Sequence, residues 1–315
     1  MNVLIHIGYH KTGSNWLQHM LFEDPATGYA WLGHETKDHP VRRVIHDRPL
    51  EFDPEEVRRR LEALARDAES RGLHPVVSLE RLSGHPFSGG HDSRQIADRL
   101  QEVLPDGRVL IVIREQRSMI LATYKQYVKA GGTGTVSQFL EPATTRSLRA
   151  RLFDYRHFEY DHLIGYYRSL FGAGNVLVLP FEQLARDGRG FVERIAAFAG
   201  RPIPADVLDR LPYTTRSNPS PSALTIAGLR RVNRFTPRTE LDPAPMAEWE
   251  RAERLAQRLK KTDLLNRRAT RKLAARAEEK LRRTVYEAVD ERYAESNRRT
   301  AELTGLGLAE YGWPV

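Results

Sequence analysis

The fold of this chain is decided by residues 5–18, which read IHIGYHKTGSNWLQ. An apolar run, Val3 to Ile7, precedes two glycines, Gly8 and Gly13, and helix-forming residues follow. In a strand, turn and helix of this kind, the first N–H groups of the helix are unpaired and the helix dipole favours an anion beside them. The glycines let the backbone approach that anion closely. The stretch therefore predicts a phosphate-binding loop.

The loop departs from the nucleoside-triphosphate loop at one position. That motif reads G-x-x-x-x-G-K-[ST], with its lysine directly after the second glycine. Here Ser14 follows the second glycine, and the lysine, Lys11, lies inside the loop. We expect Thr12, Ser14 and Asn15 to donate hydrogen bonds to the anion and Lys11 to supply a full positive charge.

Further apolar runs indicate a parallel sheet. Residues 75–79, 108–113 and 175–179 have the composition of buried strands, and 55–71 and 191–199 are amphipathic and helical. The alternation predicts an α/β fold with three layers, α/β/α, around a central parallel sheet. In such sheets ligands bind at the carboxyl ends of the strands, so the loops there are the expected active-site region.

The composition changes after about residue 212. Residues 214–224 and 236–245 are rich in Ser, Pro and Thr, and 248–299 are dense in Ala, Arg, Glu and Leu. We expect a core over residues 1–212 and a loop and C-terminal helical extension over 213–315, packed on the same domain.

The strand at 108–113 is followed by Arg114. A nucleotide triphosphatase usually has an acidic residue at the end of a neighbouring strand, which helps to hold Mg²⁺. An arginine repels a metal ion there and attracts a second phosphate. The sequence therefore predicts a site for two anionic groups, with no metal ion required.

Three motifs carry a resemblance. Residues 9–16, YHKTGSNW, resemble the 5′-phosphosulfate loop, Y-P-K-S/T-G-T/S-T-W, of sulfotransferases that use 3′-phosphoadenosine 5′-phosphosulfate (PAPS). The strand ending in Arg114 is similar to their 3′-phosphate motif. Residues 176–184, VLVLPFEQL, are similar to the "strand, aromatic, Glu, x, Leu" of a later strand. These motifs occur in the family's order over the first two thirds of the chain, which implies the P-loop-like sulfotransferase fold.

The resemblance also implies roles for single residues. Lys11 would contact the bridging and sulfuryl oxygens, residues 12–15 would bind the 5′-phosphate, and Arg114 would bind the 3′-phosphate. Trp16 would lie near the adenine, unless it simply packs in the core. The implied donor-binding residues are His10, Lys11, Thr12, Gly13, Ser14, Asn15, Trp16, Arg114, Ser118, Thr123 and Arg216.

Some of these positions depart from the family pattern. The family often has a serine eight residues after the arginine, where this chain has Ala122. Ser118 and Thr123 are the candidate replacements. A late loop caps the nucleotide in many members, and residues 216–218, which begin with Arg216, are our candidate by position alone.

Sulfuryl transfer needs a base to accept the proton of the acceptor hydroxyl. The family uses His or Glu, and the loop after residues 75–79 contains both Glu80 and His85. We expect Glu80 to be the base, with His85 as the second candidate and His10 as the third. The alternatives are a structural carboxylate paired with an arginine for Glu80, and an ordinary loop histidine for His85.

The predicted function is transfer of the sulfuryl group from PAPS to an acceptor hydroxyl, leaving adenosine 3′,5′-bisphosphate. The chain looks closer to bacterial sulfotransferases of polysaccharides or glycolipids than to the animal cytosolic enzymes, so a carbohydrate or glycolipid acceptor is favoured. Aromatic and polar residues at Tyr124, Tyr127, Lys129 and 155–167 suit a sugar, although helix packing explains most of them. The alternatives are a sulfotransferase of a small aromatic or alcohol metabolite and, less favoured, a P-loop kinase.

Charge and composition bound the remaining properties. The net charge is +8, and residues 246–300 hold 16 Lys and Arg against 10 Asp and Glu. The basic segment 258–283 could form a homodimer, contact an anionic membrane surface or be an ordinary solvent-exposed surface. It has no interleaved aromatic pattern, so nucleic acid is not expected as a partner. The chain has no cysteine and shows no signal peptide, spanning segment or metal motif, so we expect a cytoplasmic protein.

Overall fold

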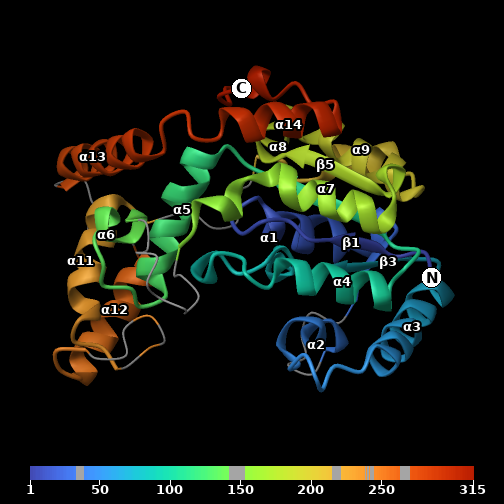
Figure 1. The fold of residues 1–315 in the computed structure, drawn as a ribbon, viewed down its shortest axis with the longest axis horizontal. Coiled ribbons are helices and arrows are strands. Elements are labelled where there is room, and N and C mark those ends of the chain that lie inside the picture. The colour runs from blue at the N-terminus through green and yellow to red at the C-terminus, as the bar shows by residue number, and fades with distance from the viewer. Residues whose placement is uncertain are drawn as a thin grey trace. The chain divides into compact units, whose positions relative to one another are not determined.

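The computed structural model describes residues 1–32, 39–141, 153–214, 221–237, 239, 241, 245–262 and 270–315. The chain forms two compact units, drawn in Figure 1. Unit 1 comprises Met1–Glu115, Asp154–Ser217 and Tyr293–Val315, and unit 2 comprises Gln116–Phe153 and Asn218–Arg292. Each unit takes segments from both sides of residue 212, so the division into 1–212 and 213–315 stays a prediction.

Unit 1 contains a five-stranded sheet in which every neighbouring pair is parallel. The strand order is β2-β3-β1-β4-β5, with Ile5 of β1 paired to Val77 of β3 and to Val109 of β4. This confirms the predicted parallel sheet and its four predicted strands. The strands are β1 (Leu4–His6), β2 (Tyr29–Trp31), β3 (His74–Ser78), β4 (Arg108–Ile113) and β5 (Val176–Pro180).

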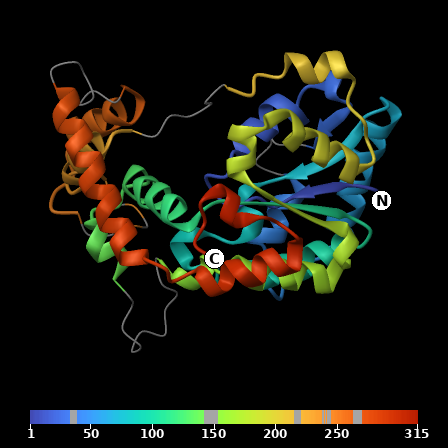
Figure 2. The ribbon, with the colours of Figure 1, turned by 90° about the horizontal axis from the view of Figure 1, so that it is seen from above.

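Helices cover both faces of this sheet, as the turned view in Figure 2 shows. Because side chains alternate along a strand, Leu110 and Val112 of β4 point to one face and Ile111 to the other. Leu110 and Val112 join a buried cluster with Trp16 and Phe191, from α1 and α9. The helices of unit 1 are α1 (Ser14–Trp16, continued by a π-helical turn, Leu17–Phe22), α2 (Pro40–His46), α3 (Pro54–Ser70), α4 (Ser93–Val103), α7 (Tyr160–Phe171), α8 (Phe181–Arg186), α9 (Gly188–Ala199), α10 (Ala205–Arg210) and α14 (Ala294–Thr304).

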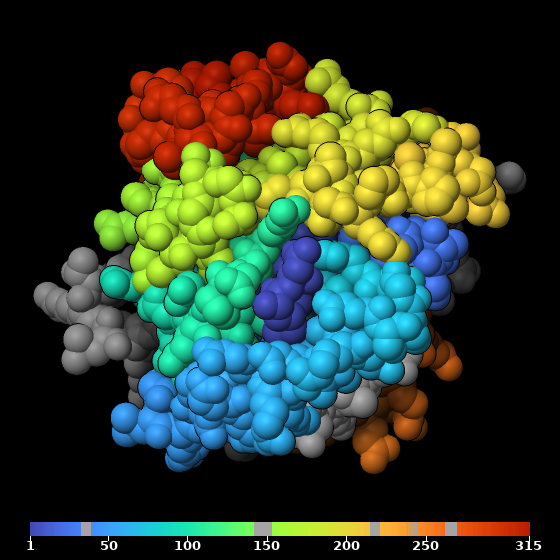
Figure 3. All heavy atoms as spheres, turned by 90° about the vertical axis from the view of Figure 1, so that its right-hand side faces the viewer, coloured from blue at the N-terminus to red at the C-terminus, as the bar shows by residue number. Residues whose placement is uncertain are grey.

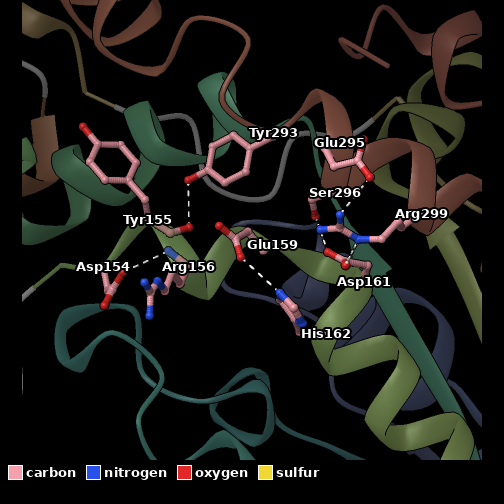
Figure 4. Close-up of polar contacts among 10 residues, drawn as sticks. All are labelled: Asp154, Tyr155, Arg156, Glu159, Asp161, His162, Tyr293, Glu295, Ser296 and Arg299. Atoms are coloured by element: carbon pink, nitrogen blue, oxygen red, sulfur yellow. Dashed lines mark hydrogen bonds and ion pairs between the residues drawn. The ribbon is translucent and has the colours of Figure 1, made fainter.

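The C-terminal helix α14 belongs to unit 1 and packs on α7 (Figure 4). The buried carboxylate of Asp161, on α7, accepts hydrogen bonds from Ser296 and from Nε of Arg299, the latter at 2.6 Å. Just before α14, the hydroxyl of Tyr293 donates to the carbonyl of Tyr155 at 2.9 Å. A buried carboxylate is stable only when its oxygens are paired, so these contacts fix α14 against the core.

The two ends of the sheet differ. At the amino end, the N-terminal residues reach the surface between the segments that lead into β3 and β4 (Figure 3, dark blue between light blue and green). There the terminal amine lies 3.2 Å from a carboxylate oxygen of Asp106. The carboxyl end carries the loops that follow β1, β3, β4 and β5, which the sequence singled out.

Unit 2 is helical. Lys125 on α5 donates to Glu278 on α13 at 2.6 Å, and the other oxygen of Glu278 accepts from the N–H of Ala223 on α11 at 2.9 Å. The predicted helical structure of residues 248–299 is confirmed over the described part of that range. Among the described residues, no helix is both long and apolar enough to cross a bilayer. The helices of unit 2 are α5 (Gln116–Lys129), α6 (Val136–Leu140), α11 (Ala223–Asn233), α12 (Glu250–Thr262) and α13 (Arg271–Val289).

Candidate active site

The loop between β1 and α1 has a backbone that few residues adopt. Lys11 has φ 68° and Gly13 has φ 82°, both in the left-handed region. A Cβ atom at Gly13 would lie 2.9 Å from the ring of Phe181, so this position needs glycine for space as well as for conformation. Left-handed backbone at a lysine costs free energy and is typical of functional sites.

Unpaired donors line this loop. Among the described residues, the backbone N–H groups of Gly13, Ser14 and Asn15 donate to no acceptor, and the buried hydroxyl of Ser14 has no hydrogen-bond partner. Thr12 differs, because its hydroxyl already donates to the carbonyl of Tyr9 at 2.5 Å. Buried polar groups are nearly always paired, so the unpaired set fits an anion as its partner.

Arg114 lies against the loop. Its Nη1 donates to the carbonyl of Lys11 at 3.0 Å, and its guanidinium carbon is 5.2 Å from the ring centre of Phe181. The next residue of the motif, Glu182, accepts a hydrogen bond from the N–H of Glu115 at 3.0 Å. The segment after β5 therefore supports both the loop and Arg114, which explains why an aromatic residue and a glutamate follow this strand.

Trp16 packs inside unit 1. It is 3% exposed, its Nε1 donates to the carbonyl of Pro212 at 3.1 Å, and its ring stacks on Tyr213 at 5.8 Å. These contacts match the alternative of a core tryptophan, and an adenine contact stays a prediction. The sequence did not single out Tyr213, because a stacking partner almost two hundred residues away leaves no local pattern.

Glu80 begins a short 3₁₀ turn, Glu80–Ser83, directly after β3. Its Oε2 lies 3.4 Å from Nδ1 of His10, within the first loop. Burial raises the pKa of Glu80, whereas contact with His10 and the charge of Lys11 lower it, and the net pKa lies below the ordinary value. The carboxylate is thus ionised at neutral pH and close to the loop lysine.

The Nδ1 atom of His85 already accepts a hydrogen bond. The N–H of Phe87 donates to this nitrogen at 3.0 Å, and burial together with the charges of His10 and Arg81 lowers the pKa of His85 to about 4. At neutral pH the ring is therefore neutral with its proton on Nε2, and neither nitrogen is free to accept a proton. This geometry favours Glu80 over His85 as the base.

A buried network supports the floor of the site. Ser78, the last residue of β3, accepts at its hydroxyl from Nε2 of Gln18 at 3.1 Å and lies 2.8 Å from Nδ1 of His6. Its carbonyl accepts from Nε1 of Trp31 at 3.1 Å. Burial lowers the pKa of His6 to about 4, so this network carries no charge at neutral pH, unlike the ionised carboxylate of Glu80.

A pocket of about 280 Å³ opens beside His10 and Glu80. Its apolar lining consists of Trp31, Leu32, Val41 and Leu79, and its polar lining of His10, Asn15, Gln18, His39, Arg42, Ser78, Glu80 and Arg81. The sequence predicted three of these residues as functional, His10, Asn15 and Glu80. The others come from segments that only the fold brings together.

The remaining predicted ligands stay predictions. Ser118 and Thr123 belong to α5 of unit 2, where the buried hydroxyl of Thr123 donates to the carbonyl of Met119 at 2.9 Å. Arg216 lies outside the residues that the structure describes. Tyr124, Tyr127 and Tyr160 are buried, so these rings pack in the protein and do not form a sugar-stacking surface.

Comparison with known proteins identifies the family. The family described as "Sulfotransferase domain" matches residues 2–220, more than half of the chain. The chain belongs to the sulfotransferase family. This confirms the predicted enzyme class, a sulfotransferase, and the predicted fold class of a central parallel sheet between helices.

Several solved sulfotransferases are similar to this chain at low identity. One from Alicyclobacillus acidocaldarius is 19% identical, with 80% of this chain and 98% of that chain covered and a TM-score of 0.46. Mouse sulfotransferase SULT7A1 complexed with PAP is 11% identical, with coverages of 91% and 88% and a TM-score of 0.40. The sulfotransferase domain from the curacin biosynthetic pathway is 12% identical, with coverages of 82% and 96% and a TM-score of 0.39. A search of curated protein sequences finds no match.

Proposed function

We propose that this sulfotransferase uses PAPS as its donor, with the 5′-phosphosulfate bound in the loop between β1 and α1. The observation that carries the proposal is the set of unpaired donors at Gly13, Ser14 and Asn15, next to a lysine in left-handed backbone. Arg114, which donates to this loop, supplies the second cation and is proposed to bind the 3′-phosphate. Two cations and a helix N-terminus suit a doubly phosphorylated adenosine without a metal ion.

The residues of the loop and of β3 divide the chemistry between them. Bound PAPS supplies the sulfuryl group, and its bond from sulfur to the phosphate oxygen breaks as the acceptor oxygen attacks. Glu80 accepts the proton of the acceptor hydroxyl, which its ionised state at neutral pH permits. Lys11 stabilises the negative charge that develops on the leaving phosphate oxygen, since its charge acts close to Glu80.

The proposed acceptor is a carbohydrate or glycolipid hydroxyl. Its support is the pocket beside Glu80, whose lining combines one indole, that of Trp31, with a set of polar side chains. A sugar ring offers one apolar face for such an indole and hydroxyls for polar groups, whereas a small phenol needs a mainly apolar pocket. Contact of the basic helices of unit 2 with an anionic membrane, and a homodimer, stay predictions.

The donor is tested by thermal unfolding with adenosine 3′,5′-bisphosphate or with ATP plus Mg²⁺. We expect the bisphosphate to raise the Tm by several degrees at saturating concentration and ATP to have little effect, because a ligand stabilises only the state that binds it. Transfer of label from ³⁵S-PAPS to a hydroxyl acceptor completes the test. Stabilisation by ATP plus Mg²⁺ alone would favour the kinase alternative and contradict the proposal.

A further inference from the structure

The pocket beside Glu80 has an arginine at its edge whose charge is not paired by any described residue. Among the described lining residues Glu80 is the one acidic residue and lies against His10, and Arg81 is paired with Asp92. Arg42, exposed on α2 at the edge of the pocket, has no side-chain partner among the residues that the structure describes. The charge of Arg42 is therefore available to a ligand.

The neighbouring arginine shows that this is not a general property of α2. Arg43 pairs with Asp47 at 2.8 Å and also with Glu56, and both partners raise its pKa. One turn of helix thus holds a neutralised arginine outside the pocket and an unpaired arginine at its edge. Guanidinium groups bind carboxylates and phosphates through two parallel hydrogen bonds, so an unpaired one at a pocket edge is suited to an anionic group.

The same pocket contains an aromatic side chain that hydrogen bonding holds in place. Nε1 of Trp31 donates to the carbonyl of Ser78 at 3.1 Å. The ring centres of Trp31 and His19 are 5.6 Å apart in an edge-on arrangement. Leu32 and Val41 add apolar surface to the same lining. At about 280 Å³ the pocket has room for a single ring, such as a monocycle or one sugar residue.

We infer that the acceptor is an acidic ring compound: a single ring that lies against Trp31 and carries a carboxylate or another anionic group bound by Arg42. This inference rests on the proposed function, because it assigns the same pocket to the acceptor. The reacting hydroxyl lies at Glu80, and the anionic group lies at the edge of the pocket formed by α2. Selectivity for acidic acceptors then comes from a residue that takes no part in the chemistry.

The test compares acceptors that differ only in the acidic group. The first pair is 4-nitrophenyl β-D-glucuronide and 4-nitrophenyl β-D-glucoside, and the second is 4-hydroxybenzoate and its methyl ester. Binding is measured by calorimetry with the protein saturated with adenosine 3′,5′-bisphosphate, so that no acid enters the donor site. We expect the acidic member of at least one pair to bind about three- to tenfold more tightly, as suits a partly exposed charge pair. The pair that shows the preference distinguishes a sugar from an aromatic acceptor.

Two variants assign the preference to one residue. Arg42→Gln should remove it, while Arg59→Gln should leave it unchanged, because Arg59 is an exposed arginine on α3 that does not line the pocket. Equal binding of acidic and neutral members in both pairs, or a preference that survives Arg42→Gln, overturns the inference. Wild-type protein that fails to bind the bisphosphate would instead contradict the proposed donor, so the two failures are distinguishable.

Discussion

The carboxylate of Glu80 lies 3.4 Å from His10 and feels the charge of Lys11, and this placement makes its role testable. Glu80→Gln keeps the shape and size of the side chain but removes the charge that accepts the proton. We expect kcat to fall by about 10²- to 10⁴-fold, the usual contribution of a general base, with the Tm shift caused by adenosine 3′,5′-bisphosphate unchanged. Stopped assays with ³⁵S-PAPS measure the first quantity and thermal unfolding the second.

The pH profile and a matched histidine variant give the control for Glu80. Because the pKa of Glu80 is lowered, kcat/KM should stay constant as the pH falls and be lost only below the ordinary range of a glutamate. His85→Asn should retain most activity, since Nδ1 of His85 is already bonded to Phe87. Full activity of Glu80→Gln together with an inactive His85→Asn would transfer the base to His85.

The hydroxyl of Ser14 is expected to contribute to ligand affinity and not to the stability of the fold. It is buried without a partner in the part of the chain that the structure describes, and removing an unpaired buried hydroxyl costs no stability. Ser14→Ala should therefore unfold at the same or a slightly higher temperature, yet bind adenosine 3′,5′-bisphosphate about tenfold more weakly, as expected for a lost hydrogen bond to a charged group. Calorimetric titration measures the affinity, and a destabilised variant with unchanged affinity would mean that Ser14 is only structural.

At the scale of elements, the loop between β1 and α1 depends on the helix that follows β5. Gly13 has φ 82°, and a Cβ there would meet the ring of Phe181 on α8 at 2.9 Å. Gly13→Ala should destabilise the protein by about 2 kcal/mol or more, since it combines left-handed strain with an overlap. It should also abolish bisphosphate binding, because the loop cannot keep its shape. Urea unfolding and calorimetry measure the two effects.

A second glycine provides the matched control. Gly165 lies inside α7, and a Cβ there would meet nothing within 4 Å. Gly165→Ala should therefore stabilise the protein by about 0.5–1 kcal/mol through helix propensity, and leave binding unchanged. If Gly13→Ala behaved like Gly165→Ala, the close approach of Phe181 to the loop would not matter.

The elements that sequence predicts well are those with a strong local pattern. The strands β1, β3, β4 and β5 are apolar runs buried on both faces, and they were predicted to within a residue or two. The strand β2 was missed, because its three residues, Tyr29–Trp31, are too short to show alternation. The loop after β1 was predictable for a similar reason, since its glycines and lysine are close in sequence.

The pocket was not predictable in this way. Trp31, Arg42 and Glu80 come from three separate segments, and nothing in their local sequence says that they face one pocket. The aromatic residues that stood out locally, such as Tyr160, are buried in the core. Long-range contacts and burial decide which polar or aromatic residue is available to a ligand, and neither can be read from spacing along the chain.

At the scale of the whole molecule, unit 1 contains buried and half-buried histidines that are neutral in the folded state over a wide pH range. Burial lowers the pKa of His6 and of His74 to about 4, and that of His157 to about 3. In the unfolded chain each has a pKa of about 6.5. Between these values the unfolded state binds more protons than the folded state, so the free energy of unfolding falls as the pH drops below 6.5. The loss ends only below the folded pKa values.

The urea midpoint at pH 7.5 and at pH 5.5 measures this effect, with an expected loss of about 1 kcal/mol for each buried histidine at the lower pH. His157→Gln, which removes one of them, should reduce the difference by about that amount. His46→Gln, at an exposed histidine of α2, should leave the difference unchanged and serves as the control.

Equal midpoints at the two pH values would mean that folding does not lower the pKa of these imidazoles, which would then be protonated at pH 5.5 in the folded protein. The neutral network of His6, Ser78 and Gln18 beneath the active site would then be charged. Otherwise His6 stays neutral in the folded protein down to about pH 4, so the network that supports Trp31 should stay intact, and acceptor binding by the folded protein should persist while the free energy of unfolding falls.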